Sequence, residues 1–169
     1  MGLLSRSGIG VGDAAPDFSL PSDDGGELRL SELLKSGPVV LFFYPKNNTA
    51  VCTKEACAFR DAHEVFAQAG AQVLGISHDS VGSHGRFRAK HSLPYNLLSD
   101  GDSVVHKLYG VRAGVSIPMI GMATNDRITF VIDGDGTVRH VHAGLLQAQE
   151  HVDEALRVVE ALVADAPTA

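Results

Sequence analysis

The sequence predicts one α/β domain of three layers, in which helices cover both faces of a β-sheet of mixed direction. Continuous apolar and β-prone runs at 39–44 and 72–77 are typical of strands buried on both faces. A segment of helical periodicity follows each run, which indicates alternating strands and helices. A hairpin pattern at 127–142 and a final amphipathic helix close the chain and add antiparallel pairing.

The expected elements of the first half are short strands at 18–20 and 27–30, a buried strand at 39–44, a helix at 49–69 and a strand at 72–77. Asp and Gly residues form the turn between the first two strands. Pro45 stops the third strand because proline has no backbone N–H to donate. Gly70 ends the helix.

The expected elements of the second half are helices at 81–91, 103–109 and 147–163, a short strand at 97–98, and hairpin strands at 127–133 and 137–142. Ser80 is the expected N-cap of the first of these helices. Gly110 closes the second one, and Gly134-Asp135-Gly136 forms the hairpin turn.

Length and composition indicate a single domain over 10–163, with flexible tails at 1–9 and 164–169. A net charge of −6 disfavours nucleic acid and anionic membrane surfaces as partners. With neither a membrane-spanning run nor a signal-peptide pattern, the chain is expected to be cytoplasmic. Two cysteines in such a chain are either inert thiols or redox-active ones.

Cys52 lies between a buried strand and the next helix, where reactive groups collect. Free amide N–H groups and the positive end of the helix dipole favour an anion there. A thiolate at this position is therefore stabilised relative to the thiol, and the thiolate is the nucleophilic form.

Pro45, Thr49 and Cys52 form the pattern Pro-x-x-x-Thr-x-x-Cys, which resembles the peroxiredoxin family. The run from Tyr44 to Asp61 is similar to the branch called bacterioferritin comigratory protein or peroxiredoxin Q. Further similar stretches lie at 73–77, 93–100, 109–111 and 127–133, so the resemblance covers about 11–162.

The resemblance implies an elaborated thioredoxin-like fold and a thiol-dependent peroxidase that reduces hydrogen peroxide and organic hydroperoxides. Cys52 would be the peroxidatic cysteine and Cys57 the resolving one. Thr49 would hydrogen-bond the peroxide, Pro45 would shield the sulfur from water, and Arg127 would stabilise thiolate and transition state. It implies a thioredoxin-like reductant, no metal or organic cofactor, and a monomer or dimer.

The spacing of Cys52 and Cys57 makes a mechanical prediction. Residues five apart on an ideal helix have Cα atoms about 8.7 Å apart, beyond the roughly 7 Å limit for a disulfide. A Cys52–Cys57 disulfide therefore requires the start of the helix to unwind. The sequence has no Cys-x-x-Cys, which a thiol-disulfide oxidoreductase would use to pair its thiols without unwinding.

Ala50-Val51 departs from the family pattern, which has Pro-Gly between Thr49 and Cys52. The change alters the allowed backbone angles and adds a β-branched side chain beside the sulfur. It favours either weaker peroxide binding or a preference for bulkier organic hydroperoxides. A non-catalytic thiol redox sensor or binding module is therefore the alternative function.

Two further sets of residues bear on the site. Glu55 is expected on the helix surface or in the first turn, where it favours the dipole, with orientation of Arg127 as the alternative. His140 and His142 share one face of a strand, but no Cys or carboxylate lies at ligand spacing from them. No metal site is therefore expected.

Overall fold

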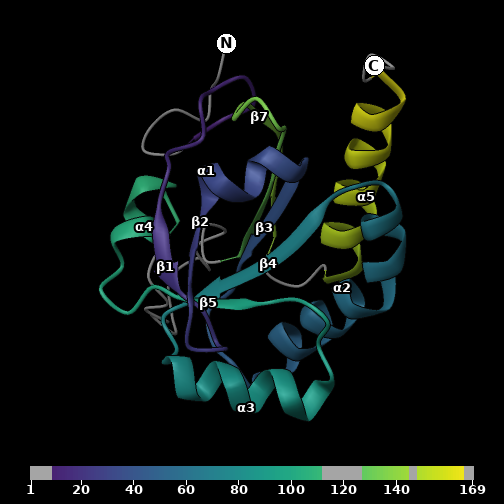
Figure 1. Cartoon of the computed structure of the whole chain (residues 1–169). Helices are drawn as coiled ribbons and strands as arrows, with labels where there is room; N and C mark the ends of the chain where they lie inside the picture. The colour runs from purple at the N-terminus through teal and green to yellow at the C-terminus, as the bar shows by residue number, and fades with distance from the viewer. Residues whose placement is uncertain (1–8, 112–126, 145–147, 166–169) are drawn as a thin grey trace.

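A computed structural model describes residues 9–111, 127–144 and 148–165, and in it a five-stranded sheet lies between two outer layers (Figure 1). The strands are β1 (Ser19–Pro21), β2 (Glu27–Arg29), β3 (Val39–Phe43), β4 (Gln72–Ser77), β5 (Leu97–Ser99), β6 (Ile128–Ile132) and β7 (Val138–Ala143). The helices are α1 (Leu30–Leu33), the 3₁₀ turn η1 (Leu34–Ser36), α2 (Ala50–Gln68), α3 (Val81–His91), α4 (Val104–Leu108) and α5 (Ala148–Asp165).

The sheet has the strand order β5-β4-β3-β6-β7, and β1 and β2 form a separate antiparallel pair. Strand β3 is parallel to β4 and β4 to β5, whereas β6 is antiparallel to both β3 and β7. The prediction of a mixed sheet is thus confirmed.

Side chains that alternate along β3 build a core on each face of the sheet. Val40 and Phe42 pack with residues of α2, α3 and α5. Leu41 and Phe43 pack on the opposite face with residues of β1, α1 and α4. This two-sided burial explains why β3 is a continuous apolar run rather than an alternating one.

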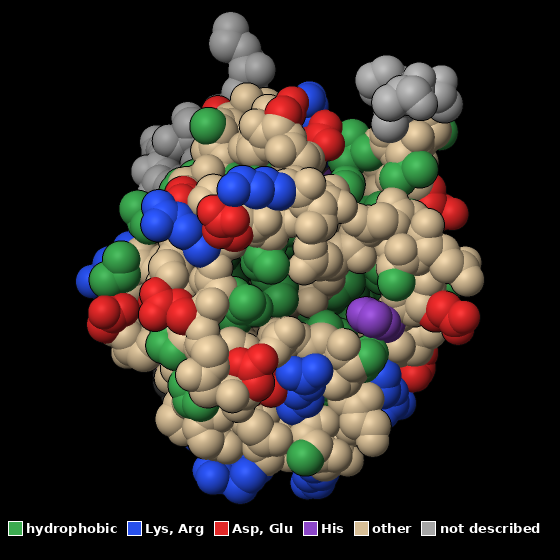
Figure 2. Space-filling view, viewed as in Figure 1, with side chains coloured by type: hydrophobic (Ala, Val, Ile, Leu, Met, Phe, Trp, Pro, Cys, Tyr) green, Lys and Arg blue, Asp and Glu red, His purple; other side chains and the backbone are tan. Residues whose placement is uncertain are grey.

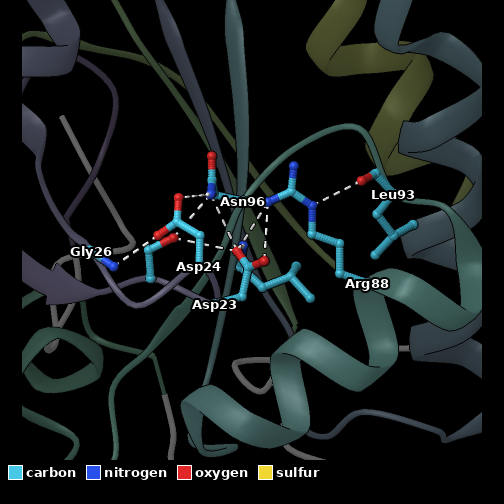
Figure 3. A network of polar contacts seen from close by, with 8 residues as sticks. Asp23, Asp24, Gly26, Arg88, Leu93 and Asn96 are labelled. Carbon is cyan, nitrogen blue, oxygen red and sulfur yellow. Dashed lines mark hydrogen bonds and ion pairs between the residues drawn. The ribbon is translucent and has the colours of Figure 1, made fainter.

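A polar network ties the turn after β1 to α3 and β5 (Figure 3). Arg88 Nη1 donates to Asp23 Oδ2 at 3.0 Å, and the Leu97 N–H donates to Asp23 Oδ1 at 2.9 Å. Asn96 Nδ2 donates to both Asp23 and Asp24. The turn is therefore held to the end of the sheet where α3 passes.

The pairing of β3 with β6 brings distant residues to one end of the sheet. Phe43, the last residue of β3, is opposite Ile128, the first residue of β6, because these strands are antiparallel. The segment that follows β3 therefore lies beside Arg127, which directly precedes β6. Cys52 lies at the start of α2, just beyond that segment.

The structure confirms most of the predicted elements, including Ser80 as an N-cap that accepts from the Ser83 N–H at 3.1 Å. Helix α1 with η1 was not predicted, and α5 continues through Asp165, into the expected tail. The expected tail at 1–9 lies outside the described residues except for Ile9. Within the described residues, no helix is both long and apolar enough to span a membrane.

Candidate active site

Cys52 lies in the first turn of α2, and the residue is only 1 % exposed. Thr49 is the N-cap, with an extended backbone. The first backbone bond of the helix runs from the Thr53 N–H to the Thr49 carbonyl, 2.9 Å. The amides of 50–52 precede that bond, so they carry the partial positive charge of the helix start, and the Cys52 amide is one of them.

Arg127 contacts the sulfur directly. Its Nη2 donates to Cys52 Sγ at 3.1 Å, and its side chain is 3 % exposed. Burial by itself lowers the pKa of Arg127, but Glu55 and Cys52 raise the pKa by more, so the guanidinium stays charged. A permanent cation with several donors thus faces the thiol in a buried site.

Glu55 holds the other side of this guanidinium, and the expectation that it lies on the helix surface is wrong. The side chain is fully buried, and Arg127 Nη1 donates to Glu55 Oε1 at 2.8 Å. Glu55 lies three positions after Cys52 on α2, so the two side chains share one face of the helix, and both contact Arg127. Burial raises the pKa of Glu55 to about 7, although Arg127 opposes that rise.

His151 of α5 lies behind Glu55 and was not singled out from the sequence. Its Nε2–H donates to the Gly144 carbonyl at 2.8 Å, so its Nδ1 is an acceptor and receives the Thr129 hydroxyl at 2.7 Å. Burial lowers the pKa of His151 to about 4, so the ring is neutral at pH 7. Glu55 Oε2 lies 3.4 Å from this lone-pair nitrogen and lacks a hydrogen-bond donor among the described residues.

The loop between β3 and α2 carries Pro45 and Thr49 and is fixed by Asn47. The Asn47 N–H donates to Asp79 Oδ2 at 2.9 Å, and Tyr44 Oη donates to Asn47 Oδ1 at 2.6 Å. Thr49 is exposed, and its hydroxyl donates to the Lys46 carbonyl at 2.9 Å. For Thr49 to donate to a peroxide, this hydroxyl must first turn away from Lys46.

Cys57 lies apart from Cys52 on the same helix, and both thiols are free. Cys57 is half-buried, and its Sγ lies 3.9 Å from His91 Nδ1, at the end of α3. Arg60 Nη1 donates to the His91 carbonyl at 2.8 Å, which holds the end of α3 against α2. The structure thus brings Arg127 to Cys52 but leaves Cys57 facing α3.

A buried thiol at a helix start, in contact with a charged guanidinium, is suited to nucleophilic chemistry. Such donors stabilise negative charge that moves from the sulfur to a leaving oxygen in a transition state. These features define a thiol-based redox enzyme.

The comparisons with known proteins specify the class. The AhpC/TSA family model matches residues 11–141. The chain is 42 % identical over 154 residues to a chloroplastic peroxiredoxin Q of Oryza sativa subsp. japonica, with 91 % of this chain and 68 % of the relative covered. The chloroplastic peroxiredoxin Q of Arabidopsis thaliana is 42 % identical over 153 residues, with 90 % and 68 % covered.

Solved structures agree with these relatives. The crystal structure of peroxidoxin BcpB from Mycobacterium tuberculosis superposes with a TM-score of 0.81 at 41 % identity, covering 90 % of this chain and 97 % of that one. A Xanthomonas campestris peroxiredoxin Q structure gives a TM-score of 0.77 at 29 % identity, covering 86 % and 91 %. The chain therefore belongs to the AhpC/TSA family, in its peroxiredoxin Q branch, and is a thiol-dependent peroxidase with a thioredoxin-like fold.

Proposed function

We propose that this peroxidase reduces hydroperoxides through a sulfenic acid on Cys52 and a disulfide between Cys52 and Cys57. The observation that carries the proposal is the 3.1 Å contact between Arg127 Nη2 and Cys52 Sγ in a buried site at the start of α2. Among the described residues, Cys57 receives no hydrogen bond from a guanidinium: its sulfur contacts His91, and Arg60 acts on it only through its charge.

The proposed cycle has three balanced steps. The Cys52 thiolate attacks one peroxide oxygen, the O–O bond breaks, and the leaving oxygen takes a proton to become water or an alcohol. The Cys57 thiol then displaces hydroxide from the sulfenic acid, which releases water and forms the disulfide. A dithiol reductant finally reduces the disulfide by exchange and is itself oxidised to a disulfide.

Arg127 is proposed to act in the first step. Its guanidinium lies where charge moves from sulfur to the leaving oxygen, and it can donate to both without a proton of its own being lost. Glu55 holds the guanidinium in place through Nη1, which leaves Nη2 directed at the sulfur. Thr49 and Pro45 are proposed to bind the peroxide and to exclude water, respectively.

The second step requires α2 to open. Both cysteines lie within the helix, and their Cα atoms on an ideal helix are about 8.7 Å apart, which exceeds the roughly 7 Å reach of a disulfide. Cys57 must also leave its contact with His91. The first two turns of α2 therefore unwind between the sulfenic acid and the disulfide.

The proposed reductant is thioredoxin-like, and the proposed substrates include organic hydroperoxides. A Xanthomonas campestris bacterioferritin comigratory protein, 29 % identical with a TM-score of 0.77, is described by its alkyl peroxide reduction activity. Ala50 is exposed and Val51 is half-buried beside Cys52, so they add apolar surface near the sulfur. A monomer or dimer and a cytoplasmic location stay predictions.

Figure 2 offers support for the absence of a nucleic-acid partner. On the viewed face, Lys and Arg side chains lie in several separate places, with Asp and Glu side chains near most of them. A duplex requires clustered positive charge, and the chain has a net charge of −6.

Turnover with a recycling system tests the proposal. Wild type, Cys52→Ser and Cys57→Ser are compared for NADPH oxidation in the presence of thioredoxin, thioredoxin reductase and hydrogen peroxide, t-butyl or cumene hydroperoxide. We expect Cys52→Ser to abolish turnover with every peroxide and Cys57→Ser to abolish the thioredoxin-dependent rate. Full thioredoxin-dependent turnover in Cys57→Ser would contradict the disulfide between the two cysteines. Higher efficiency with hydrogen peroxide than with cumene hydroperoxide would contradict a preference for bulky substrates.

A further inference from the structure

Two histidines and a glutamate converge between the edge strand β7 and helix α5, on the side of the sheet opposite α1 and α4. His140 and His142 come from β7, and Glu154 comes from α5. One potential ligand atom from each residue lies within 4.8 Å of those from the other two. These three residues are called the β7–α5 cluster.

The distances in the cluster fit the coordination shell of a small divalent cation. His142 Nδ1 lies 3.2 Å from Glu154 Oε2, and His140 Nε2 lies 3.6 Å from the same oxygen. Two ligands bound tetrahedrally at about 2.0–2.1 Å from zinc are about 3.3–3.4 Å apart. The two separations in the cluster, 3.2 and 3.6 Å, lie on either side of that value.

Two ring nitrogens of the cluster lack a hydrogen bond within the described part of the chain. The Nε2 atoms of His140 and His142 are buried and have no hydrogen-bond partner among the described residues. Neutral imidazole nitrogen is a common ligand of zinc, copper and nickel.

The surroundings supply an outer contact and an entry path. His142 Nε2 lies 3.9 Å from Glu150 Oε2, so binding a cation through Nδ1 would leave the other ring nitrogen near a second carboxylate. Glu154 has 36 % of its side chain exposed, so solvent ions reach the cluster. The positive charge of Arg157 opposes the binding of a cation, whereas the negative charges of Glu150 and Glu154 favour it.

We propose that His140, His142 and Glu154 bind a first-row divalent cation of zinc-like chemistry, with Glu150 orienting His142. Two imidazole nitrogens and a carboxylate disfavour calcium and magnesium, which require oxygen ligands. Three protein ligands leave one position for water. This proposal departs from the expectation of no metal site, which rested on the spacing of ligands along the sequence. The packing of α5 on β7 brings Glu154 to the two histidines.

The site is distinct from the peroxidatic centre but adjoins it. The His142 ring packs edge-on against His151, with centroids 4.5 Å apart, and His151 lies beside Glu55. The cluster contains neither thiol, so metal binding can be tested without the catalytic cysteines.

Zinc titration by isothermal calorimetry tests the proposal. The protein is untagged and carries Cys52→Ser and Cys57→Ser, so that no thiolate competes for the metal. In this background we expect one Zn²⁺ per chain with a Kd in the micromolar range. His142→Gln and Glu154→Gln, which keep much of the side-chain volume, are each expected to weaken binding more than 100-fold.

Two comparisons make the result specific to the cluster. Glu150→Gln is expected to weaken binding about 10- to 100-fold, as loss of an outer-shell partner does. His63→Gln, a histidine of α2 outside the cluster, is expected to leave the Kd within about twofold. Zinc should also raise the Tm of the background protein and of His63→Gln, but not of Glu154→Gln, because binding stabilises only a native site.

No zinc binding in the background protein would overturn the proposal. It would also be overturned if Glu154→Gln and His142→Gln each bound zinc as tightly as the background protein does. Unfolding of a variant is detected by its Tm without metal. Should His142→Gln fail to fold, Glu154→Gln on the half-exposed face of α5 decides the outcome alone.

Discussion

At the scale of single residues, one guanidinium divides its hydrogen bonds between a nucleophile and a carboxylate. Arg127 donates through Nη2 to Cys52 and through Nη1 to Glu55. Both partners are almost completely buried, so water weakens neither interaction. The net positive potential that Arg127 and Glu55 together create at the sulfur therefore depends on the protonation state of Glu55.

Replacement of Arg127 by lysine tests its proposed role. Lysine keeps the charge but loses the planar fork that bridges Cys52 and Glu55. We expect Arg127→Lys to lower the second-order rate constant for hydrogen peroxide about 100-fold, the size of effect seen when one transition-state donor is lost. Stopped-flow measurement of Cys52 oxidation gives this constant. Arg29→Lys, at an exposed ion pair, is the control, and a rate within threefold of wild type in Arg127→Lys would contradict the role.

Glu55 predicts a pH dependence of the same reaction. Its pKa is raised to about 7 by burial, so near neutral pH the carboxyl changes from charged to neutral as the pH falls. In the neutral form it compensates less of the Arg127 charge. The rate of Cys52 alkylation by iodoacetamide should therefore show an inflection near pH 7 that Glu55→Gln removes. Asp61 is an exposed carboxylate on the same helix, so Asp61→Asn should keep the inflection. An inflection that persists in Glu55→Gln would belong to another group and would contradict the prediction.

At the scale of elements, the stability of the start of α2 controls the second step of the cycle. Tyr95 Oη donates to the Ala56 carbonyl at 2.6 Å, a bond between the core and the helix segment that separates the two cysteines. Cys57 is held in turn toward α3. Unwinding must break these contacts before the sulfurs can meet.

Removal of the Tyr95 hydroxyl should make this unwinding easier. A neutral hydrogen bond contributes about 0.5–1.5 kcal/mol net, so we expect Tyr95→Phe to speed disulfide formation after peroxide addition about 2- to 10-fold. Quenched samples alkylated at timed intervals and weighed by mass spectrometry give the rate. Tyr109→Phe removes a similar 2.6 Å bond, to the Pro16 carbonyl, on the opposite face of the sheet and should have no effect. Equal rates in wild type and Tyr95→Phe would show that this bond persists during disulfide formation.

The elements themselves were largely predictable because their signals are local. The apolar run of β3, the Ser80 cap of α3 and the glycine turn before β7 each depend on residues adjacent in the chain. Helix α1 was missed because its four residues follow β2 without an N-cap side chain, and it is held by packing of Leu30 in the core. A helix of one turn has too little periodicity to be recognised.

At the scale of the whole molecule, Glu55 and His151 couple the site to stability with opposite signs. The pKa of His151 falls from 6.5 to about 4 on burial, so its contribution to stability is present above pH 6.5 and is lost as the pH falls toward 4. The pKa of Glu55 rises from 4.5 to about 7, so its contribution is present below pH 4.5 and is lost as the pH rises through 7. As the pH falls from 6.5 to 4.5, the stability lost through His151 is therefore largely offset by the stability gained through Glu55.

Glu55→Gln should expose the His151 contribution. We expect the variant to lose about 2–3 kcal/mol more unfolding free energy than wild type between pH 6.5 and 4.5, at about 1.4 kcal/mol per pKa unit. Urea unfolding at the two pH values measures this difference. The Asp61→Asn control should follow wild type, and equal losses in Glu55→Gln and wild type would contradict the cancellation.

The candidate site was predictable only where a motif marks it. Pro45, Thr49 and Cys52 lie within eight residues of one another, and Arg127 was predicted from the resemblance alone. Glu55, His151 and the β7–α5 cluster could not be assigned, because their partners come from β6, β7 and α5 and meet only after the sheet is formed. Glu55 had one local signal, its position one turn after Cys52, and burial decided its role.

The central claim is that Cys52, in contact with Arg127, is the thiol that peroxide oxidises first. The most direct measurement is a single turnover of reduced Cys57→Ser with one equivalent of hydrogen peroxide and dimedone, followed by peptide mass spectrometry. The account predicts a dimedone adduct on Cys52, and in wild type a Cys52–Cys57 disulfide with little adduct. An unlabelled Cys52 in Cys57→Ser would contradict this account. A dimedone adduct on Cys57 in Cys52→Ser, formed as fast as peroxide oxidises wild type, would also contradict it.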